Sequence, residues 1–305
     1  MRHVPQRIAL IVNPTAGKGV GRVIGEQVLA LLHAAGHAVV DASGRSLDEA
    51  KARGLAAISD GAETVVVVGG DGMVNLGVNL CAGRPVRLAV VAAGTGNDFA
   101  RNLGLPVRDP AAAVRVISGA HTRRVDAGRV TGASGEVRWF GGVLGASFDA
   151  VVNARASRMS WPRGQMRYNL AILRELPVFK PIPYAIELDD RRIESHAMLV
   201  AVANTTSFGG GMNVCPHADV TDGLFDVLVL SEISIPQFLR VFPRVYHGKH
   251  LSHPAVEVYR SSRVRLEAVG IESQADGEVF ERLPLSIENV RGALDVVVGP
   301  VGGAR

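Results

Sequence analysis

The chain has 305 residues, 47% of them hydrophobic and 20% charged, with a formal net charge of +4 and a pI of about 9.4. This balance is typical of a globular protein and excludes a disordered or collagen-like chain, and the length predicts two domains of moderate size. The basic residues form no long run and no RNA-binding signature accompanies them, so we attribute the charge to solvated faces and expect no nucleic-acid partner. Two cysteines, Cys81 and Cys215, are too few for a disulfide framework and indicate a reducing cytoplasm.

The N-terminus has only a short apolar run, over residues 8–12, and so lacks the apolar core of a signal peptide. The longest apolar run, over residues 197–203, is far below the roughly 18 residues of a membrane-spanning helix. We therefore expect a soluble protein, or one that lies on a membrane surface.

The first third of the chain alternates apolar runs with segments of helical periodicity. Continuous Val, Ile and Leu strands separated by helices predict a parallel sheet covered on both faces. In the helix near the N-terminus, Val23, Leu29 and Leu32 are expected to face inward. The expected strands are 7–12, 38–40, 64–68 and 87–92, and the expected helices are 20–35, 46–59 (opened by a serine cap) and 73–81.

From about residue 125 the pattern changes to apolar and polar residues that alternate between Gly and Ser turns, which is typical of antiparallel strands. We predict a hairpin around Asp189 and Asp190 and helices over residues 160–176 and 235–246. The sequence thus predicts an α/β domain followed by a β-rich domain.

Three glycine-containing loops follow apolar strands of the first domain, over residues 13–19, 69–72 and 94–98. In a parallel sheet these loops lie at one carboxyl edge, where open α/β folds bind ligands. Glycine turns and helix N-termini present unpaired N–H groups that bind phosphate. The spacing matches neither a P-loop nor a dinucleotide fingerprint, yet three such loops together favour a nucleotide.

Two carboxylates, Asp71 and Asp98, belong to these loops. Beside phosphate groups they would repel the ligand unless a divalent cation lay between them, which indicates a Mg-nucleotide. Taken alone, either aspartate could be a helix cap.

The segments NPTAGKG, VVVVGGDGMVN and AAGTGNDFARNLGLP resemble the nucleotide-loop motifs of the diacylglycerol kinase catalytic family, soluble bacterial lipid kinases related to sphingosine and ceramide kinases. The resemblance continues in ADVTDGLFDVLVL and QADGEVF, so it covers nearly the whole chain. It implies an α/β ATP-binding domain over residues 1–125, onto which residues 290–305 could pack back. A β-rich, sandwich-like lipid domain over residues 126–289 would follow, with the active site in the cleft between the two domains.

The resemblance also implies site residues. Glu278 would accept the proton of the acceptor hydroxyl, with Asp276 beside it, and Asp71 would hold the Mg-nucleotide. A structural magnesium ion would be bound by Asp219, Asp222 and the main chain of Leu224. The residues expected to contact ATP are Asn13, Pro14, Thr15, Ala16, Gly17, Ser43, Gly69, Gly70, Asp71, Gly72, Met73, Val74, Asn75 and Thr95.

One departure from the family pattern is Met73, which stands where the family usually has threonine, so a hydroxyl that could bond a phosphate oxygen is lost. The resemblance favours ATP- and Mg²⁺-dependent phosphorylation of a lipid, with diacylglycerol giving phosphatidic acid. Two alternatives stay open: a kinase of a soluble acceptor such as NAD, whose kinases share the GGDG loop, and a divergent nucleotide-binding regulatory protein without turnover.

The segment SWPRGQMRYNLAILRELPVFKP, residues 160–181, mixes aromatic and apolar side chains with arginines, as an interfacial helix on anionic lipid does. A core helix with a basic outer face is the alternative. The expected partners are ATP, a lipid substrate and an anionic membrane surface, and the resemblance leaves room for a homodimer. The expected location is the cytoplasm, peripheral at the inner face of the membrane.

Overall fold

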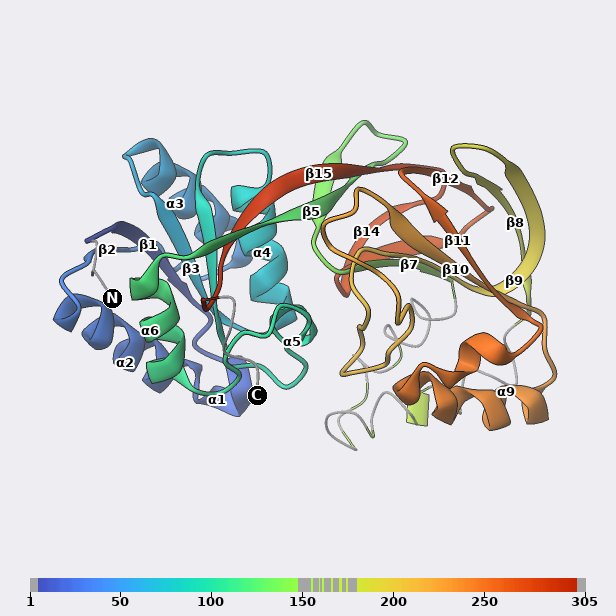
Figure 1. Cartoon of the computed structure of the whole chain (residues 1–305), viewed down its shortest axis with the longest axis horizontal. Helices are drawn as coiled ribbons and strands as arrows, with labels where there is room; N and C mark the ends of the chain where they lie inside the picture. Colours follow the sequence, from blue (N-terminus) through green and yellow to red (C-terminus); the bar gives the residue numbers. More distant parts are fainter. Residues whose placement is uncertain are drawn as a thin grey trace. The chain divides into compact units, whose positions relative to one another are not determined.

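The computed structural model describes residues 5–147 and 180–300, together with positions 155, 159, 161, 166, 170, 171 and 174 (Figure 1). The chain forms two compact units, Met1–Ala127 with Arg291–Arg305, and Gly128–Val290. The first unit thus combines both ends of the chain, while the second is one continuous segment. No helix in the described ranges has the length and apolar character needed to cross a membrane.

The first unit is a parallel sheet with helices on both faces, as predicted (Figure 1). The strand order is β15-β4-β3-β1-β2. Helices α2 and α6 pack on one face, and α3 and α4 on the other. The elements are β1 (Arg7–Val12), α1 (Ala16–Gly19), α2 (Gly21–Ala34), β2 (Ala38–Asp41), α3 (Leu47–Ser59), β3 (Thr64–Gly69), α4 (Asp71–Cys81), β4 (Arg87–Ala92), α5 (Asp98–Asn102), α6 (Pro110–Gly119) and β5 (Thr122–Thr131), with the end of β15 (Leu285–Val297).

The helix boundaries follow local chemistry. The hydroxyl of Ser46 accepts the N–H of Glu49 at 3.1 Å and opens α3, which confirms the predicted serine cap. In α2 the prediction for Val23 is wrong, because this side chain is 64% exposed. The face of α2 that packs on the sheet instead contains Gly25, where a β-carbon would lie 2.5 Å from Val12. Hydrophobic periodicity cannot register a glycine that contacts the sheet directly.

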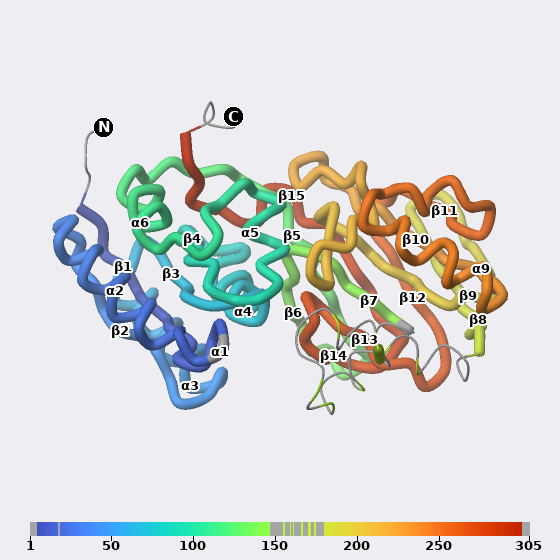
Figure 2. The backbone as a smooth tube through the Cα atoms, turned by 90° about the horizontal axis from the view of Figure 1, so that it is seen from below, coloured from blue at the N-terminus to red at the C-terminus, as the bar shows by residue number. Residues whose placement is uncertain are grey.

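The second unit is built from antiparallel strands around β9, which pairs with β7, β8 and β10 (Figure 2). The predicted hairpin at Asp189 and Asp190 connects β8 to β9. Phe140 and Phe225 stack in its core with ring centroids 5.7 Å apart. The remaining elements are β6 (Val137–Phe140), β7 (Val143–Ser147), β8 (Ile182–Glu187), β9 (Arg192–Ala203), β10 (Phe225–Ser231), α9 (Ile235–Val241), the 3₁₀ helices η1 (Phe242–His247) and η2 (Lys249–Ser252), β11 (Val256–Ser261), β12 (Arg263–Glu267), β13 (Glu272–Ala275) and β14 (Glu278–Arg282).

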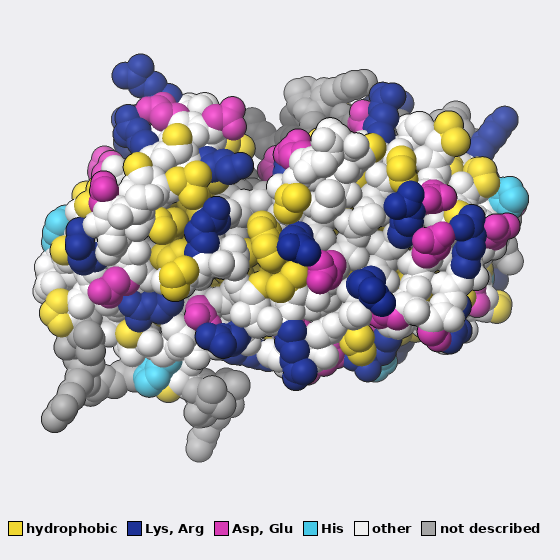
Figure 3. Space-filling model, turned by 90° about the horizontal axis from the view of Figure 1, so that it is seen from above, with side chains coloured by type: hydrophobic (Ala, Val, Ile, Leu, Met, Phe, Trp, Pro, Cys, Tyr) yellow, Lys and Arg dark blue, Asp and Glu magenta, His cyan; other side chains and the backbone are white. Residues whose placement is uncertain are grey.

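The helix predicted over residues 235–246 is present, but its second half is 3₁₀. Pro243 lies just beyond α9 and has no N–H for an α-helical bond, so the chain tightens into η1 there. The helix predicted over residues 160–176 lies mostly outside the described residues. On the face drawn in Figure 3, basic and acidic side chains are interspersed, with no large field of one sign.

Candidate active site

The three glycine loops of the first unit lie together at the carboxyl ends of β1, β3 and β4. A β-carbon on Gly17, whose φ is +59°, would lie 2.6 Å from the carbonyl oxygen of Ala93. A β-carbon on Gly94 would lie 2.4 Å from the α-carbon of Gly70. The three main chains therefore approach so closely that no side chain fits between them, which explains the glycines.

Asp71 ties two of these loops together. Its Oδ2 accepts the N–H of Asn97 at 2.8 Å, and its Oδ1 accepts the N–H of Asp98 at 2.8 Å. A β-carbon on Gly96 would lie 2.4 Å from Oδ2, so this position also requires glycine. Because each carboxylate oxygen has a second lone pair, the same side chain can still face a cation. The binding of a Mg-nucleotide by Asp71 stays a prediction.

Asn97 fixes the loop after β4 from within. It has a left-handed φ of 59°, its Oδ1 accepts the N–H of Gly94 at 3.0 Å, and its Nδ2 donates to the carbonyl of Gly94 at 2.9 Å. Thr95 lies exposed at the tip. Among the described residues no acceptor bonds the N–H groups of Thr95 and Gly96, so both can bind an anion.

Two arginines beside this loop were missed by the sequence reasoning. The guanidinium of Arg101 donates to the carbonyl of Gly96 and lies 3.5 Å from Asp98. Arg108 has a φ of 58°, bonds Ala92 through its main chain at 2.9 Å, and reaches the carbonyl of Gly94 with its side chain at 3.5 Å. Both guanidinium groups therefore lie against the main chain of the loop after β4. Their positions in the sequence could have indicated them, since both arginines follow the glycine loop within 12 residues.

The loop after β1 is closed by Asn13, whose Oδ1 accepts from both the N–H and the hydroxyl of Thr15, at 3.0 and 2.8 Å. Ser43 lies beside it, because its hydroxyl oxygen accepts the N–H of Val12 at 2.9 Å. Pro14 and Thr15 are exposed, whereas Ala16 is buried. The predicted set is therefore gathered at one edge, with its members differently accessible.

The α4 end of the site is mostly covered. Met73, Val74 and Asn75 are buried, and the N–H groups of Met73 and Val74 already bond the carbonyl of Gly70 at 3.0 and 3.1 Å. The side chain of Met73 packs on Gly69, where a β-carbon would lie 2.4 Å from its Cγ. The accessible donors here are the first amides of α4, at Asp71 and Gly72, which lack intrahelical acceptors.

In the second unit, Asp276 occupies a main-chain nest. Its Oδ2 accepts the N–H of Gly141 at 2.9 Å, and its Oδ1 accepts those of Gly142 and Val143 at 2.8 and 3.1 Å. Its own φ is 52°, and its N–H bonds the carbonyl of Val143 at 3.0 Å. Asp276 thereby fixes the turn between β13 and β14 to the start of β7.

Glu278, two residues later, is partly exposed at the start of β14. Its carboxylate makes no hydrogen bond or ion pair with any residue in the described ranges. Of the two acidic residues in this turn, Glu278 is therefore the one whose side chain is available to a substrate.

The loop expected to hold a structural magnesium ion contains an arginine contact instead. Asp222 accepts the N–H of Leu224 at 2.9 Å through Oδ1, and its Oδ2 pairs with the guanidinium of Arg260. Arg260 also lies 3.5 Å from the buried Asp226, whose pKa is raised by burial against the opposing charge of Arg260. The carbonyl of Leu224 accepts from the side chain of Asn289 at 3.1 Å.

The third expected ligand of this loop, Asp219, is also bonded locally, since its Oδ1 accepts the N–H and the hydroxyl of Thr221 at 2.9 and 2.7 Å. Within the part of the chain that the structure describes, no three His, Cys, Asp or Glu side chains gather in a metal-binding arrangement. The side chains of Asp219 and Asp222 and the carbonyl of Leu224 are engaged by protein groups, so in this structure they do not form an open cation site. The structural magnesium ion expected from the family resemblance remains a prediction.

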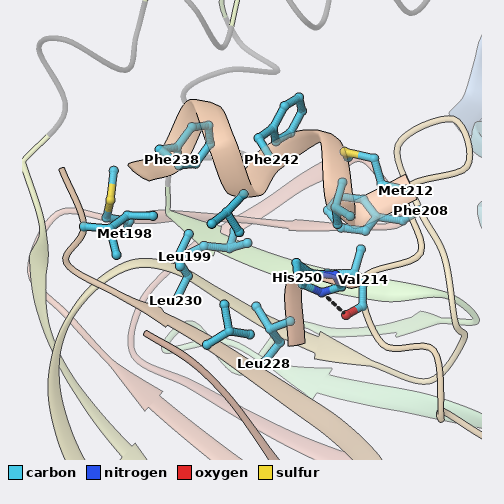
Figure 4. A pocket seen from close by; sticks show the side chains of 14 residues that line it. Met198, Leu199, Phe208, Met212, Val214, Leu228, Leu230, Phe238, Phe242 and His250 are labelled. Atoms are coloured by element: carbon cyan, nitrogen blue, oxygen red, sulfur yellow. Dashed lines mark hydrogen bonds between the residues drawn. The ribbon is translucent and has the colours of Figure 1, made fainter. Parts of the chain in front are cut away.

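An apolar pocket of about 90 Å³ lies in the second unit, between the sheet and the α9–η1 segment. Figure 4 shows Phe238 and Phe242 on the helical side and Leu228 and Leu230 on the sheet side. His250 also lines the pocket and is 5% exposed.

The imidazole of His250 is the polar group of this lining. Its Nε2 lies 2.8 Å from the carbonyl of Val214, which can only accept, so Nε2 donates (Figure 4). Burial lowers the pKa of His250, against the effect of this hydrogen bond, and favours the neutral ring. Its Nδ1 has no hydrogen-bond partner among the described residues.

The family model described as "Diacylglycerol kinase catalytic domain" matches residues 7–130, and the one described as "YegS C-terminal NAD kinase beta sandwich-like domain" matches residues 142–298. The chain is 37% identical over 297 residues to a diacylglycerol kinase of Mycobacterium tuberculosis, covering 97% of this chain and 96% of that protein. It is 29% identical to a diacylglycerol kinase of Bacillus subtilis (strain 168), covering 96% of each.

Among solved structures, a candidate diacylglycerol kinase from Bacillus anthracis str. Sterne superposes with a TM-score of 0.78 at 25% identity, covering 97% of this chain and 98% of that one. An NAD kinase from Archaeoglobus fulgidus, solved in complex with ATP, shares the fold with a TM-score of 0.53 at 13% identity. It covers 96% of this chain and 94% of its own.

Proposed function

Because the chain belongs to the diacylglycerol kinase family, we propose that it transfers the γ-phosphate of ATP to a hydroxyl group of a lipid, and that this lipid is diacylglycerol, which becomes phosphatidic acid. The observation that carries the choice of a lipid is the apolar pocket of the second unit. We further propose that the protein works in the cytoplasm, peripherally at the inner face of the membrane.

The glycine loops of the first unit support ATP as the donor. Phosphoryl transfer depends mainly on holding the phosphates and neutralising their charge. The N–H groups of Thr95 and Gly96 and the first amides of α4 can hold phosphate oxygens, and Arg101 and Arg108 add positive charge. Mg²⁺, when bound, would supply further charge neutralisation at the phosphates, and the carboxylate of Asp71 faces the loop in which it would be held.

Glu278 is the proposed general base. Its carboxylate would take the proton of the acceptor hydroxyl as that oxygen forms its bond to the γ-phosphorus and the bond to ADP breaks. The availability of this side chain supports the assignment, whereas Asp276 has both oxygens bonded to main-chain N–H groups. We therefore propose Asp276 as a positioning residue, which holds the turn that carries Glu278.

The apolar pocket would hold the end of an acyl chain. Its volume of about 90 Å³ equals about three times the share of one water molecule in the liquid, and its lining is nearly all hydrocarbon. Each methylene group buried there would contribute about 0.8 kcal/mol. A soluble acceptor such as NAD would gain nothing from such a lining, which favours a lipid.

The two rival functions make different predictions. The shared fold of an ATP-bound NAD kinase keeps a soluble acceptor open, and Met73 in place of a threonine keeps open a nucleotide-binding protein without turnover. Incubating the purified protein with labelled ATP and either diacylglycerol vesicles, extracted lipids or NAD distinguishes all three. Phosphorylated lipid supports the proposal, phosphorylated NAD replaces it, and nucleotide binding without any product favours the regulatory protein.

A pocket-filling variant tests the acyl-chain site. Leu199 lines the pocket, so Leu199→Phe should reduce activity on long-chain diacylglycerol more than on a soluble short-chain one. The matched control is Leu188→Phe, a partly buried leucine that packs against a different cluster of the same unit. Equal effects of the two substitutions on both lipids would contradict the assignment of this pocket.

A further inference from the structure

A second cavity of the second unit is basic. It measures about 530 Å³ and is lined by His217, Arg244, Gly248, Lys249, Leu251 and Ser252. The side chains of His217, Arg244 and Lys249 are exposed, and no carboxylate lines the cavity. Within the described ranges neither Arg244 nor Lys249 forms an ion pair, although most arginines of this unit do. Unpaired positive charge around a hollow is suited to an anion.

Main-chain contacts hold this cavity in shape. The N–H of Asn213 donates to the carbonyl of Val245 at 3.1 Å. Gly248, with a φ of +68°, comes so near Pro216 that a β-carbon would lie 2.6 Å from its ring. Together with the bond from His250 to Val214, these contacts fix the loop that carries His217 against the 3₁₀ turns that carry Arg244 and Lys249.

The neighbouring helix presents apolar side chains to solvent. On α9, Ile235 is 40% and Leu239 45% exposed, one helical turn apart, and Arg240 beside them is exposed as well. The opposite side of α9 and η1 is buried, and its Phe238 and Val245 line the apolar pocket. Figure 2 shows α9 on the outside of the second unit. Apolar side chains bordered by arginines are typical of a helix that lies in a membrane interface.

We propose that His217, Arg244 and Lys249 bind the headgroup phosphate of an anionic phospholipid in a bilayer, while Ile235 and Leu239 enter the interface beside it. The inference rests on the proposed function, because it places the segment that covers the acyl-chain pocket against the membrane that contains the substrate. This proposal places an anionic membrane contact on α9, η1 and η2. It is separate from the contact predicted for residues 160–181, which lie mostly outside the described residues.

The test is sedimentation of the full chain with phosphatidylglycerol–phosphatidylcholine vesicles. Each basic residue near an anionic surface strengthens binding about five-fold, so Arg244→Gln with Lys249→Gln should weaken partitioning by about 30-fold. Pure phosphatidylcholine vesicles should bind wild type and variant equally weakly. The control removes two exposed arginines of the first unit, Arg115→Gln with Arg123→Gln, and should lose far less.

Partitioning of the Arg244 and Lys249 variant like wild type would overturn the proposal, as would an equal loss in the control. Inorganic phosphate at constant ionic strength should shift the melting temperatures of wild type and variant by the same amount. If it raises the melting temperature of wild type more than that of the variant, the cavity is a site for a soluble anion and the proposal fails. Activity on a short-chain diacylglycerol dissolved as monomer should survive in the variant. If wild type binds the vesicles but phosphorylates no lipid, the proposed function is contradicted while the proposed headgroup site is still supported.

Discussion

The Oδ2 atom of Asp71, at the start of α4, accepts the main-chain N–H of Asn97 at 2.8 Å, so one side chain joins the loop after β3 to the loop after β4. Asp71→Ala should therefore abolish nearly all transfer activity, by about 100-fold or more. It should also reduce the free energy of unfolding by about 1–3 kcal/mol, because two N–H groups lose their acceptor. Kinase assays well below the melting temperature, combined with urea unfolding, measure both effects.

The matched control is Asp109→Ala, since Oδ1 of Asp109 accepts the N–H of Ala112 at 2.8 Å and caps α6 in the same unit. This substitution should reduce stability by about 1 kcal/mol and leave activity unchanged. Near-normal activity of Asp71→Ala would contradict the assignment of the glycine loops to the nucleotide.

Glu278→Gln should lower kcat by about 10²- to 10⁴-fold, the usual contribution of a general base. The melting temperature should stay within a degree or two of wild type, because this carboxylate bonds none of the described residues. The KM for ATP should change little. Glu272→Gln, on the preceding strand, is the control and should retain full activity.

Asp276→Asn should behave differently from Glu278→Gln. Its carboxylate accepts three N–H groups, and an amide can offer only one oxygen to them, so stability and activity should both fall. An Asp276→Asn protein that is as stable as wild type but inactive would make Asp276 the base instead.

The carboxylate of Asp189 should contribute to the stability of the folded protein in a way that depends on pH. Partial burial alone would raise its pKa, but hydrogen bonds from Ser262, Arg263 and Ser261 outweigh this and hold the pKa below the ordinary value. A lowered folded-state pKa stabilises the protein above the unfolded pKa of about 3.9, and this contribution is lost as pH falls through the folded value. The melting-temperature difference between wild type and Asp189→Asn should therefore be constant near neutrality and shrink below about pH 4.

The neighbouring Asp190→Asn serves as its control. Asp190 is exposed, and among the described residues its carboxylate pairs with Arg191, so solvent should screen most of its effect. If both variants have the same acid profile, the contacts between Asp189 and the turn before β12 do not contribute as inferred.

The ion pairs of Arg260 determine how the loop that contains Asp219 and Asp222 should respond to Mg²⁺. Since its guanidinium already lies against Asp222 and Asp226, Mg²⁺ without nucleotide should barely shift the melting temperature of wild type. Arg260→Gln leaves the two carboxylates without their cation, so it should melt lower and recover part of the loss when Mg²⁺ is added. A Mg²⁺ shift in wild type that disappears in Asp222→Ala would instead support the magnesium site at Asp219, Asp222 and Leu224.

The fold was largely predictable because its signals are local. Buried parallel strands are continuous runs of β-branched residues, and β4 was predicted with the bounds that the structure shows, Arg87–Ala92. In α2 the inward positions of Leu29 and Leu32 were predicted correctly. The first part of its buried face was not, since Gly21 and Gly25 pack where a longer side chain would collide. The change to a 3₁₀ helix after Val241 was signalled only by a proline.

For the candidate site, sequence patterns indicated which loops converge but not how the side chains are used. A motif cannot show that Asp71 and Asp276 direct their oxygens to main-chain N–H groups of distant loops, because those partners are set by tertiary contacts. The pairing of Arg260 with Asp222, 38 residues apart, is hidden for the same reason. Apolar pockets built from several strands and a helix leave no periodic signal of their own.

The final strand, β15, also determines the order in which the molecule can be completed during synthesis. Asp295 and Val296 pair with Arg87 and Leu88 of β4, and the carbonyl of Ala293 accepts the N–H of Gly83 at 2.8 Å, so the edge of the first unit is built from residues that follow the whole second unit in the chain. The second unit, Gly128–Val290, is continuous and can close while β4 still has an open edge. The amino-terminal unit of this kinase is therefore the last to be finished, and a fragment ending at residue 127 would carry an unpaired strand edge prone to association.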